Sequence, residues 1–183
     1  MIMANEILHY LTTTPSRPTN EASKTDRGIY GLFDHEGHLS YIGSTKNPAE
    51  NFYKRIHSRH RTGSEDYSHY FSKVYNTGRM WRDRHSTAHD QDAKIAKGFR
   101  NSFIAEYCSA VWFPLHATPA EIVAMEMEVI QIAPARAKYW NANTRIKYPE
   151  PIELVDSLIE KLGVSMHYQE AMRRQGQRCA AAS

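Results

Sequence analysis

The sequence predicts an α+β fold in which a small, mainly antiparallel, three-stranded sheet is flanked by helices. Two short β-type runs, GIYGLF (28–33) and HLSYIG (38–43), are separated by a turn sequence, and a third run, CSAVWFPL (108–115), follows much later. Helical periodicity occupies the chain after the second and third runs. The order β-β-α, insertion, β-α is typical of an α+β sandwich, and by itself it indicates no function.

The first two strands are expected to form a hairpin because the residues between them, DHEG (34–37), end in a glycine. Gly37 can adopt the positive φ that a tight hairpin turn requires. The hairpin is followed by a predicted helix over about residues 48 to 60, with Asn47 as its cap and Pro48 in its first turn.

Helices also surround the third strand. Residues 67–76 have helical spacing, residues 79–94 form a polar excursion, and residues 95–107 predict another helix. After the strand, TPAE (118–121) matches a capping box with proline at the first helical position, and Pro134 ends the helix that it starts.

A chain of 183 residues is long enough for one well-cored domain. Residues 1–27 are expected to be an N-terminal arm, because residues 12–27 are polar, contain two prolines and lack periodicity. The main domain then covers residues 28–147, with a helical insertion over about 62–104. Residues 148–183 are expected to form a C-terminal helical extension.

Composition indicates a soluble globular protein, with 41% hydrophobic and 23% charged residues. No apolar run approaches the roughly 20 residues of a membrane helix, so no membrane partner is expected. The N-terminus carries Asn5, Glu6 and His9 where a signal peptide has an apolar core, which predicts a cytoplasmic protein. Cys108 and Cys179 have no metal-ligand spacing and are expected to be thiols.

The net charge of +3 is small, but its distribution is uneven. YKRIHSRHR (53–61) and ARAKYWNANTRIK (135–147) each carry four Lys or Arg residues and no acid. Basic stretches interleaved with aromatic residues suit a phosphate backbone. Two solvated faces would have the same composition, and both interpretations stay open at this point.

Glu126 is the most informative single position. Projected at roughly 100° per residue, it lies in the middle of an apolar stripe, within about 60° of Ile122, Val123, Val129, Ile130 and Ala133. Glu128 falls on the polar side of the same helix. A carboxylate directed at a core is costly unless a cation or metal compensates it. A glutamate at the edge of the stripe, or one paired with an arginine for structural reasons, is the alternative.

Five elements, in order, resemble the GIY-YIG nuclease superfamily. GIY (28–30) is followed after ten residues by YIG (41–43), within the stretch YIGSTKN. YKRI (53–56) resembles the start of the family's first helix, and Glu126 with the apolar residues and Pro134 after it resembles the family's metal-binding helix. YWN (139–141) resembles its closing aromatic-Asn element. The resemblance covers about residues 28 to 143.

This resemblance implies a nuclease that hydrolyses phosphodiester bonds with one Mg²⁺ ion, for which Mn²⁺ can substitute. Tyr30 is then the candidate general base, Tyr41 its neighbour at the scissile phosphate, and Arg55 the phosphate-binding cation. Glu126 would hold the metal and Asn141 would be a positioning residue. A tyrosine has a pKa of ~10 and needs nearby cations to act at neutral pH, which Lys46 or Lys73 are candidates to provide.

The sequence also departs from the family pattern. The family often has a histidine or tyrosine one turn after the essential arginine, but position 59 is another arginine. His57 and His60 are both candidates for this place. Asn143 competes with Asn141, because the spacing of this element from Glu126 varies in the family.

The implied partner is double-stranded DNA, with a homodimer on the target. The leading hypothesis is a sequence-specific endonuclease of restriction type. A phage or mobile-element nuclease of looser specificity, a non-cleaving DNA-binding protein and a structural interaction domain are the alternatives. Candidate DNA-binding residues are the glycines that would approach phosphate and the cations around the motif and in the insertion: Gly28, Gly43, Lys46, Lys54, Arg59, Lys73, Arg79, Arg82, Arg84 and Lys138.

Overall fold

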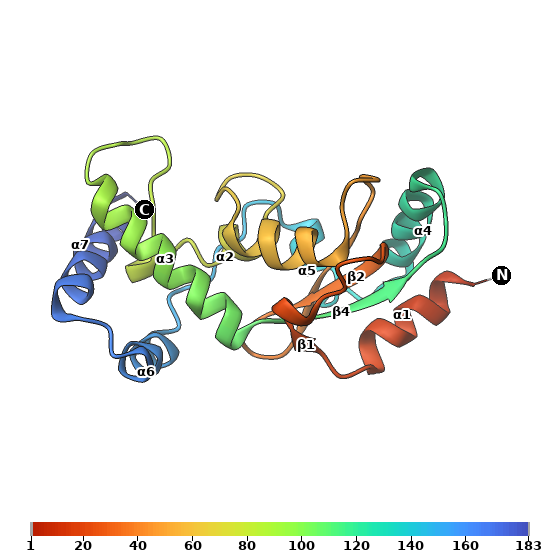
Figure 1. The fold of residues 1–183 in the computed structure, drawn as a ribbon, viewed down its shortest axis with the longest axis horizontal. Helices are drawn as coiled ribbons and strands as arrows, with labels where there is room; N and C mark the ends of the chain where they lie inside the picture. The colour runs from red at the N-terminus through yellow and green to blue at the C-terminus, as the bar shows by residue number, and fades with distance from the viewer. Residues whose placement is uncertain (1, 183) are drawn as a thin grey trace. The chain divides into compact units, whose positions relative to one another are not determined.

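The computed structural model describes residues 2–182 (Figure 1). It divides into two compact units, each assembled from two segments of the chain. The first unit contains the chain up to His60 together with Ala105–Thr144, and the second contains Arg61–Ile104 together with the chain from Arg145 onward. Helix α3 (Asp90–Tyr107) carries the chain from the second unit back to the first.

An antiparallel sheet of four strands lies in the first unit, in the order β1-β4-β2-β3. The strands are β1 (Arg17–Pro18), β2 (Gly28–Phe33), β3 (Leu39–Ser44) and β4 (Ser109–Pro114). The α+β class is confirmed, and the expected strand count of three is wrong. The additional strand, β1, has only two residues and contains a proline, so its local sequence carries no strand signal.

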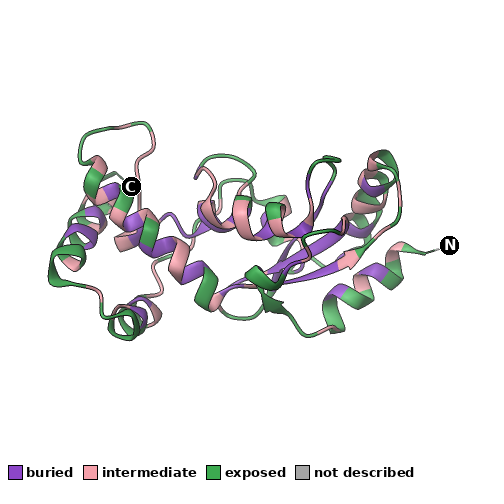
Figure 2. Cartoon of the chain, in the orientation of Figure 1, coloured by how far each residue is buried: buried purple, intermediate pink, exposed green. Residues whose placement is uncertain are grey.

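The predicted hairpin is confirmed, and Gly37 at its turn has a φ of 77°. The central strand β2 places Tyr30 opposite Gly43 of β3 on one side and Trp112 of β4 on the other. Buried residues are concentrated along these strands (Figure 2). Tyr30 itself is fully buried.

One face of the sheet is covered by α1 (Ala4–Thr13) and α4 (Pro119–Ile132). Ile7 and Leu11, one helical turn apart on α1, are both fully buried. They join a core formed by the strands and α4, which includes Ile29, Leu39, Ile42, Val111, Ile122 and Val129. The segment expected to be an arm therefore contributes a helix and a strand to the first unit. Burial of apolar side chains against the sheet holds it there.

Helix α4 begins as its sequence predicts. The Thr118 side chain accepts from the backbone N–H of Glu121, and the Glu121 carboxylate accepts from the backbone N–H of Thr118. Pro119 takes the first helical position, where no N–H is needed. The last residue is Ile132, followed by Ala133 in an extended conformation.

The helix expected over residues 48–60 is shorter at its start and differently wound. Residues 47–49 form a turn, and Asn51 is the cap, since its side-chain oxygen accepts from the backbone N–H of Lys54 at 2.8 Å. The element η2 (Tyr53–His60) is a π-helix, with i→i+5 hydrogen bonding. Ile56 of η2 and Phe52, the residue directly before η2, are both buried in the first unit.

The second unit contains α2 (Tyr70–Val74), η3 (Gly78–Met80), most of α3, α6 (Ile152–Leu162) and α7 (Met166–Ala182). The C-terminal extension thus forms two helices. Helix α3 begins at Asp90, earlier than the expected residue 95. Inside this unit the fully buried Arg100 bonds Glu65 and Asn76. Among residues 2–182, no helix combines the length and apolar character that crossing a bilayer requires.

Candidate active site

Tyr30 lies at the centre of a cluster in the first unit. Its phenolic oxygen is 2.7 Å from Nε2 of His60, and the Nε–H of Arg55 donates to it at 3.3 Å. The phenol comes from the central strand β2, and both partners come from η2. Two residues that the sequence nominates for phosphate chemistry, Tyr30 and Arg55, are therefore in direct contact.

The π-winding of η2 explains why His60 belongs to this cluster. In an α-helix, residues five positions apart, such as Arg55 and His60, are separated by roughly 140° around the axis. In a π-helix the i→i+5 pattern brings them to one face. His57 points elsewhere, with Nδ1 2.9 Å from Oγ1 of Thr19 and its ring against Tyr53. Of the two candidate histidines, the structure places His60 at Tyr30.

Tyr41 and Gly43 of β3 complete the surroundings of the phenol. The ring centroid of Tyr41 is 6.1 Å from that of Tyr30 and 5.5 Å from that of His60. A Cβ atom at Gly43 would be 2.7 Å from the Tyr30 hydroxyl oxygen, so only glycine leaves room for the phenol. Gly28 has a similar internal reason, because a Cβ there would be 2.2 Å from the carbonyl oxygen of Phe113. Both glycines accommodate the protein's own atoms, so their presence does not depend on a phosphate.

Burial raises the pKa of Tyr30 to about 12. The charge and hydrogen bond of Arg55 lower the pKa and the charge of Glu126 raises it, but the loss of hydration dominates. The cation beside this phenol is thus Arg55, whereas the sequence nominates Lys46 or Lys73. Lys46 is exposed and Lys73 belongs to the second unit. The phenol of the protein without substrate is therefore protonated at neutral pH.

In a Tyr30→Phe variant, the free energy of unfolding is expected to fall less at alkaline pH than in the wild type. Because the folded pKa lies above the ordinary value of about 10, the stabilisation is complete below pH ~10 and is lost as pH rises through about 12. Across this range the free energy of unfolding of the wild type should fall by roughly 3 kcal/mol more than that of the variant. Urea unfolding between about pH 8.5 and pH 11.5 measures it. The exposed Tyr67→Phe should retain the wild-type pH dependence, and an identical dependence in Tyr30→Phe would contradict the assignment.

Glu126 lies on the inner face of α4, as its helical phase predicts. Ile122 and Val129 beside it are fully buried, Glu126 is half-buried, and Glu128 is exposed. The hydroxyl of Ser44 donates to Oε2 of Glu126 at 2.6 Å. Ser44 was missed as a site residue, although it directly follows the YIG tripeptide, because its partner is 82 residues away.

The Glu126 carboxylate fits a Mg²⁺ ion of the kind that binds substrate phosphate. Mg²⁺ is commonly held by one or two carboxylates, with phosphate oxygens and waters completing the shell. Ser44 engages one carboxylate oxygen, and the other has no hydrogen-bond partner within residues 2–182. A hydrogen-bonded carboxylate oriented in this way can bind a metal with its second oxygen.

Asn141 holds the outer edge of β3. Its side chain accepts from the backbone N–H of Ile42 at 3.0 Å and donates to the carbonyl of the same residue at 2.8 Å. It reaches the strand from α5 (Tyr139–Ala142). Asn143 instead donates to the carbonyl of Tyr139 at an exposed position. Of the two asparagines, Asn141 therefore positions the strand that carries Tyr41, Gly43 and Ser44.

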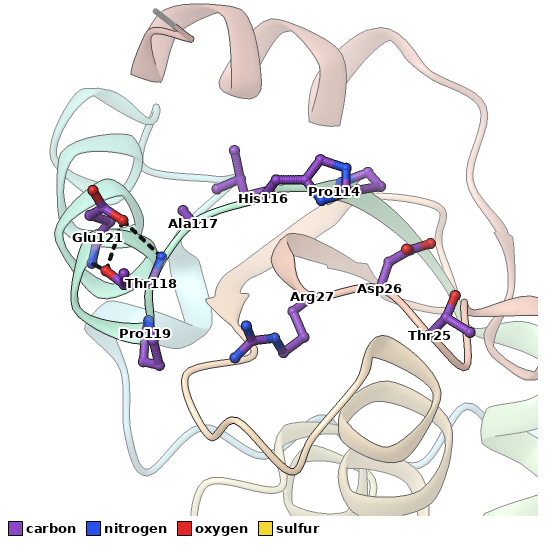
Figure 3. Close-up of a pocket in the computed structure, with 10 residues that line it drawn as sticks. Thr25, Asp26, Arg27, Pro114, His116, Ala117, Thr118, Pro119 and Glu121 are labelled. Carbon is purple, nitrogen blue, oxygen red and sulfur yellow. Dashed lines mark hydrogen bonds between the residues drawn. The ribbon is translucent and has the colours of Figure 1, made fainter.

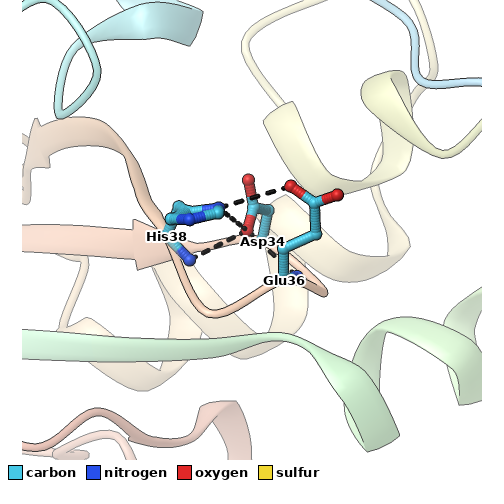
Figure 4. Close-up of side chains that lie close together, drawn as sticks. All are labelled: Asp34, Glu36 and His38. Atoms are coloured by element: carbon cyan, nitrogen blue, oxygen red, sulfur yellow. Dashed lines mark hydrogen bonds and ion pairs between the residues drawn. The ribbon is translucent and has the colours of Figure 1, made fainter.

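A second group of metal-ligand types, Asp34, Glu36 and His38, lies at the hairpin turn (Figure 4). Asp34 is buried and accepts from the backbone N–H groups of Glu36 and His38, from the Ser40 hydroxyl and from Arg136. These bonds satisfy its carboxylate and tie the hairpin to the chain before α5. A structural role therefore accounts for this cluster.

Most of the predicted DNA-binding cations have internal partners. In the first unit, Arg59 pairs with Glu50, and the Lys54 and Lys138 ammonium groups donate to backbone carbonyls. In the second unit the partners are mainly acids from other segments: Arg79 with Glu150 and Asp156, Arg82 with Glu65, and Arg84 with Asp66, while Lys73 lies over the ring of Tyr70. Lys46 is exposed and has no ion pair or hydrogen bond within residues 2–182. Most of these cations are thus engaged in ion pairs or hydrogen bonds within the protein.

Comparisons of this chain with protein-family models, with curated proteins and with solved structures find no match.

Proposed function

We propose that the chain is a Mg²⁺-dependent endonuclease of the GIY-YIG type that hydrolyses phosphodiester bonds in DNA. The observation that carries the proposal is the contact of one phenol, Tyr30, with both His60 and Arg55, on a sheet whose next strand holds Glu126 through Ser44. These groups provide a proton acceptor, a phosphate-binding cation and a metal-binding carboxylate, which are the parts that phosphodiester hydrolysis requires.

In this proposal, Tyr30 transfers a proton rather than holding a negative charge. Its pKa of about 12 makes a resting phenolate unfavourable at neutral pH. With Nε2 of His60 unprotonated, the phenol donates its proton to that nitrogen, 2.7 Å away, as it accepts one from the attacking water. Arg55 stabilises the electron-rich phenolic oxygen during this exchange through its Nε–H.

The remaining side chains act on the phosphate. The outer nitrogens of the Arg55 guanidinium suit two phosphate oxygens, because its planar fork matches their geometry. Tyr41, next to both Tyr30 and His60, supplies a hydroxyl for the water or the phosphate. Glu126 would hold Mg²⁺, which stabilises charge on the leaving oxygen when bound. Asn141 keeps β3 in place.

The finer assignment is a sequence-specific enzyme of restriction type that acts as a dimer on double-stranded DNA. One site of this kind breaks one phosphodiester bond, so two copies related by a twofold axis would cut both strands. The second unit supplies residues beyond the minimal site, and these residues could contact bases. A nuclease of looser specificity would use the same chemistry.

Incubation of the purified protein with mixed-sequence plasmid DNA tests the proposal. Cleavage is expected with Mg²⁺ or Mn²⁺ and none with excess EDTA, because the proposed chemistry uses a metal ion at Glu126 to stabilise charge on the leaving oxygen. Discrete fragments would support the restriction type, and smearing or nicking would support looser specificity. Intact plasmid under all metal conditions and at several salt concentrations would contradict the nuclease assignment.

A further inference from the structure

A hollow of about 700 Å³ lies in the first unit, outside the cluster around Tyr30. It is bounded by the segment that leads into β2 and by the segment that joins β4 to the first turn of α4 (Figure 3). Its lining includes Asp26, Arg27, His116, Thr118 and Glu121. Nothing in the chemistry proposed above uses this hollow.

The two acids of the hollow already have partners. The Glu121 carboxylate accepts from the backbone N–H of Thr118 at 2.8 Å and from its hydroxyl at 2.7 Å, which lowers the pKa of Glu121. Asp26 accepts from the hydroxyl of Ser23 at 2.7 Å. Both carboxylates are hydrogen-bonded within their own segments, and neither forms an ion pair with Arg27.

Arg27 is the arginine of the hollow, and it has no ion pair in the described chain. Its backbone is held in place, since its carbonyl accepts from the N–H of Leu115 at 2.8 Å. Its guanidinium extends into the hollow toward the start of α4 (Figure 3) and makes no hydrogen bond or ion pair with any of residues 2–182. One of its nitrogens, Nη1, is also shielded from solvent. A partly desolvated guanidinium without a partner is costly, and an anion bound to it would remove the cost.

The hollow lies at the same end of the sheet as the candidate metal carboxylate. The residue after Arg27, Gly28, is bonded to Thr45 through its N–H at 2.8 Å and its carbonyl at 3.0 Å. The residue before Thr45 is Ser44, which holds Glu126. Helix α4 likewise carries both Glu121 of the hollow and Glu126. A DNA strand bound at Glu126 would therefore pass close to Arg27.

We propose that this hollow binds a backbone phosphate of the DNA strand, adjacent to but distinct from the phosphate that is cleaved, with Arg27 as its ligand. The inference rests on the proposed nuclease function. The Arg27 guanidinium forms a bidentate pair with two phosphate oxygens, and the volume leaves space for the attached sugar. This contact fixes the register of the strand relative to Tyr30 and Glu126.

The salt dependence of DNA binding tests this assignment without requiring cleavage. Affinity of the full chain for a fluorescent duplex is measured with Ca²⁺ in place of Mg²⁺ across a range of salt concentrations. Loss of one phosphate contact is expected to lower the slope of log affinity against log salt by about 0.9 in Arg27→Ala, with an affinity about tenfold weaker at low salt. Arg27→Lys should retain the slope. The matched control is Arg173→Ala, an exposed arginine of α7 without an ion pair in the described chain, which should retain both.

The outcomes separate this inference from the proposed function. An unchanged slope in a folded Arg27→Ala variant would overturn the phosphate site even if the wild type cleaves DNA. A reduced slope with no cleavage by the wild type would support the site and count against the nuclease. If the duplex does not bind but inorganic phosphate raises the melting temperature of the wild type and not of Arg27→Ala, the hollow takes the free anion and the assignment to DNA is wrong. Circular dichroism confirms that each variant is folded.

Discussion

Glu126→Gln is expected to reduce Mg²⁺-dependent DNA cleavage by roughly 10³-fold, while DNA binding in Ca²⁺ stays within about threefold of wild type. Glutamine keeps the shape of the side chain and can still accept from Ser44, 2.6 Å away in the wild type. It removes the negative charge that would hold the metal in the proposed site. Single-turnover cleavage of a duplex, measured over a range of Mg²⁺ concentrations, provides the rate and the apparent metal affinity.

The same helix offers a matched control. Glu128→Gln makes the same chemical change two residues further along α4, at an exposed position, and should leave the rate and the metal affinity unchanged. Ser44→Ala should be intermediate, with about a tenfold loss, because it removes the orienting hydrogen bond and keeps the carboxylate. Equal rates for Glu126→Gln and Glu128→Gln would eliminate Glu126 as the metal ligand.

His60→Gln is expected to lower the cleavage rate by about 10²- to 10⁴-fold, the usual contribution of a general acid or base. Nε2 of His60 is the atom in contact with the Tyr30 phenol, and glutamine lacks a basic nitrogen to receive its proton. Single-turnover cleavage rates of the wild type and of the variant on the same duplex measure the effect.

His57→Gln is the control on the same π-helix. His57 contacts Thr19 through Nδ1 and Tyr53 through its ring, so this substitution should keep the rate within about threefold of wild type. Together, the two substitutions His57→Gln and His60→Gln test the π-helical winding of η2 as well as the chemistry. If His57→Gln loses activity and His60→Gln keeps it, the π-helical arrangement of the site is wrong.

Features that depend on a few neighbouring residues could be predicted from the sequence. Gly37 forms the hairpin turn because its conformation is set within four residues. The capping box of Thr118 and Glu121 determines where α4 begins, and helical phase places Glu126 on the inner face. The α+β class follows from the same local patterns, because each pattern depends only on residues that are close together in the sequence.

Features that depend on residues far apart in the sequence could not be predicted from it. Arg79 of the insertion forms ion pairs with Glu150 and Asp156, which lie more than 70 residues later in the chain. Strand β1 exists only because Arg17 and Pro18 lie opposite Ser109 and Ala110 of β4. Charge counts and strand propensities contain no term for such contacts, so neither the Arg79 ion pairs nor strand β1 could be predicted.

The sequence alone identified candidate side chains for the proposed site: the two tyrosines of β2 and β3, Arg55 and Glu126. Only the tertiary structure decided which of these side chains are in contact with one another. It selected His60 over His57 through the π-winding of η2, chose Asn141 by its bonds to Ile42, and added Ser44. It also showed that burial raises the pKa of Tyr30. The physical reason is that local chemistry sets turns and caps, whereas hydration, helical winding and long-range pairing depend on what the folded chain places around each group.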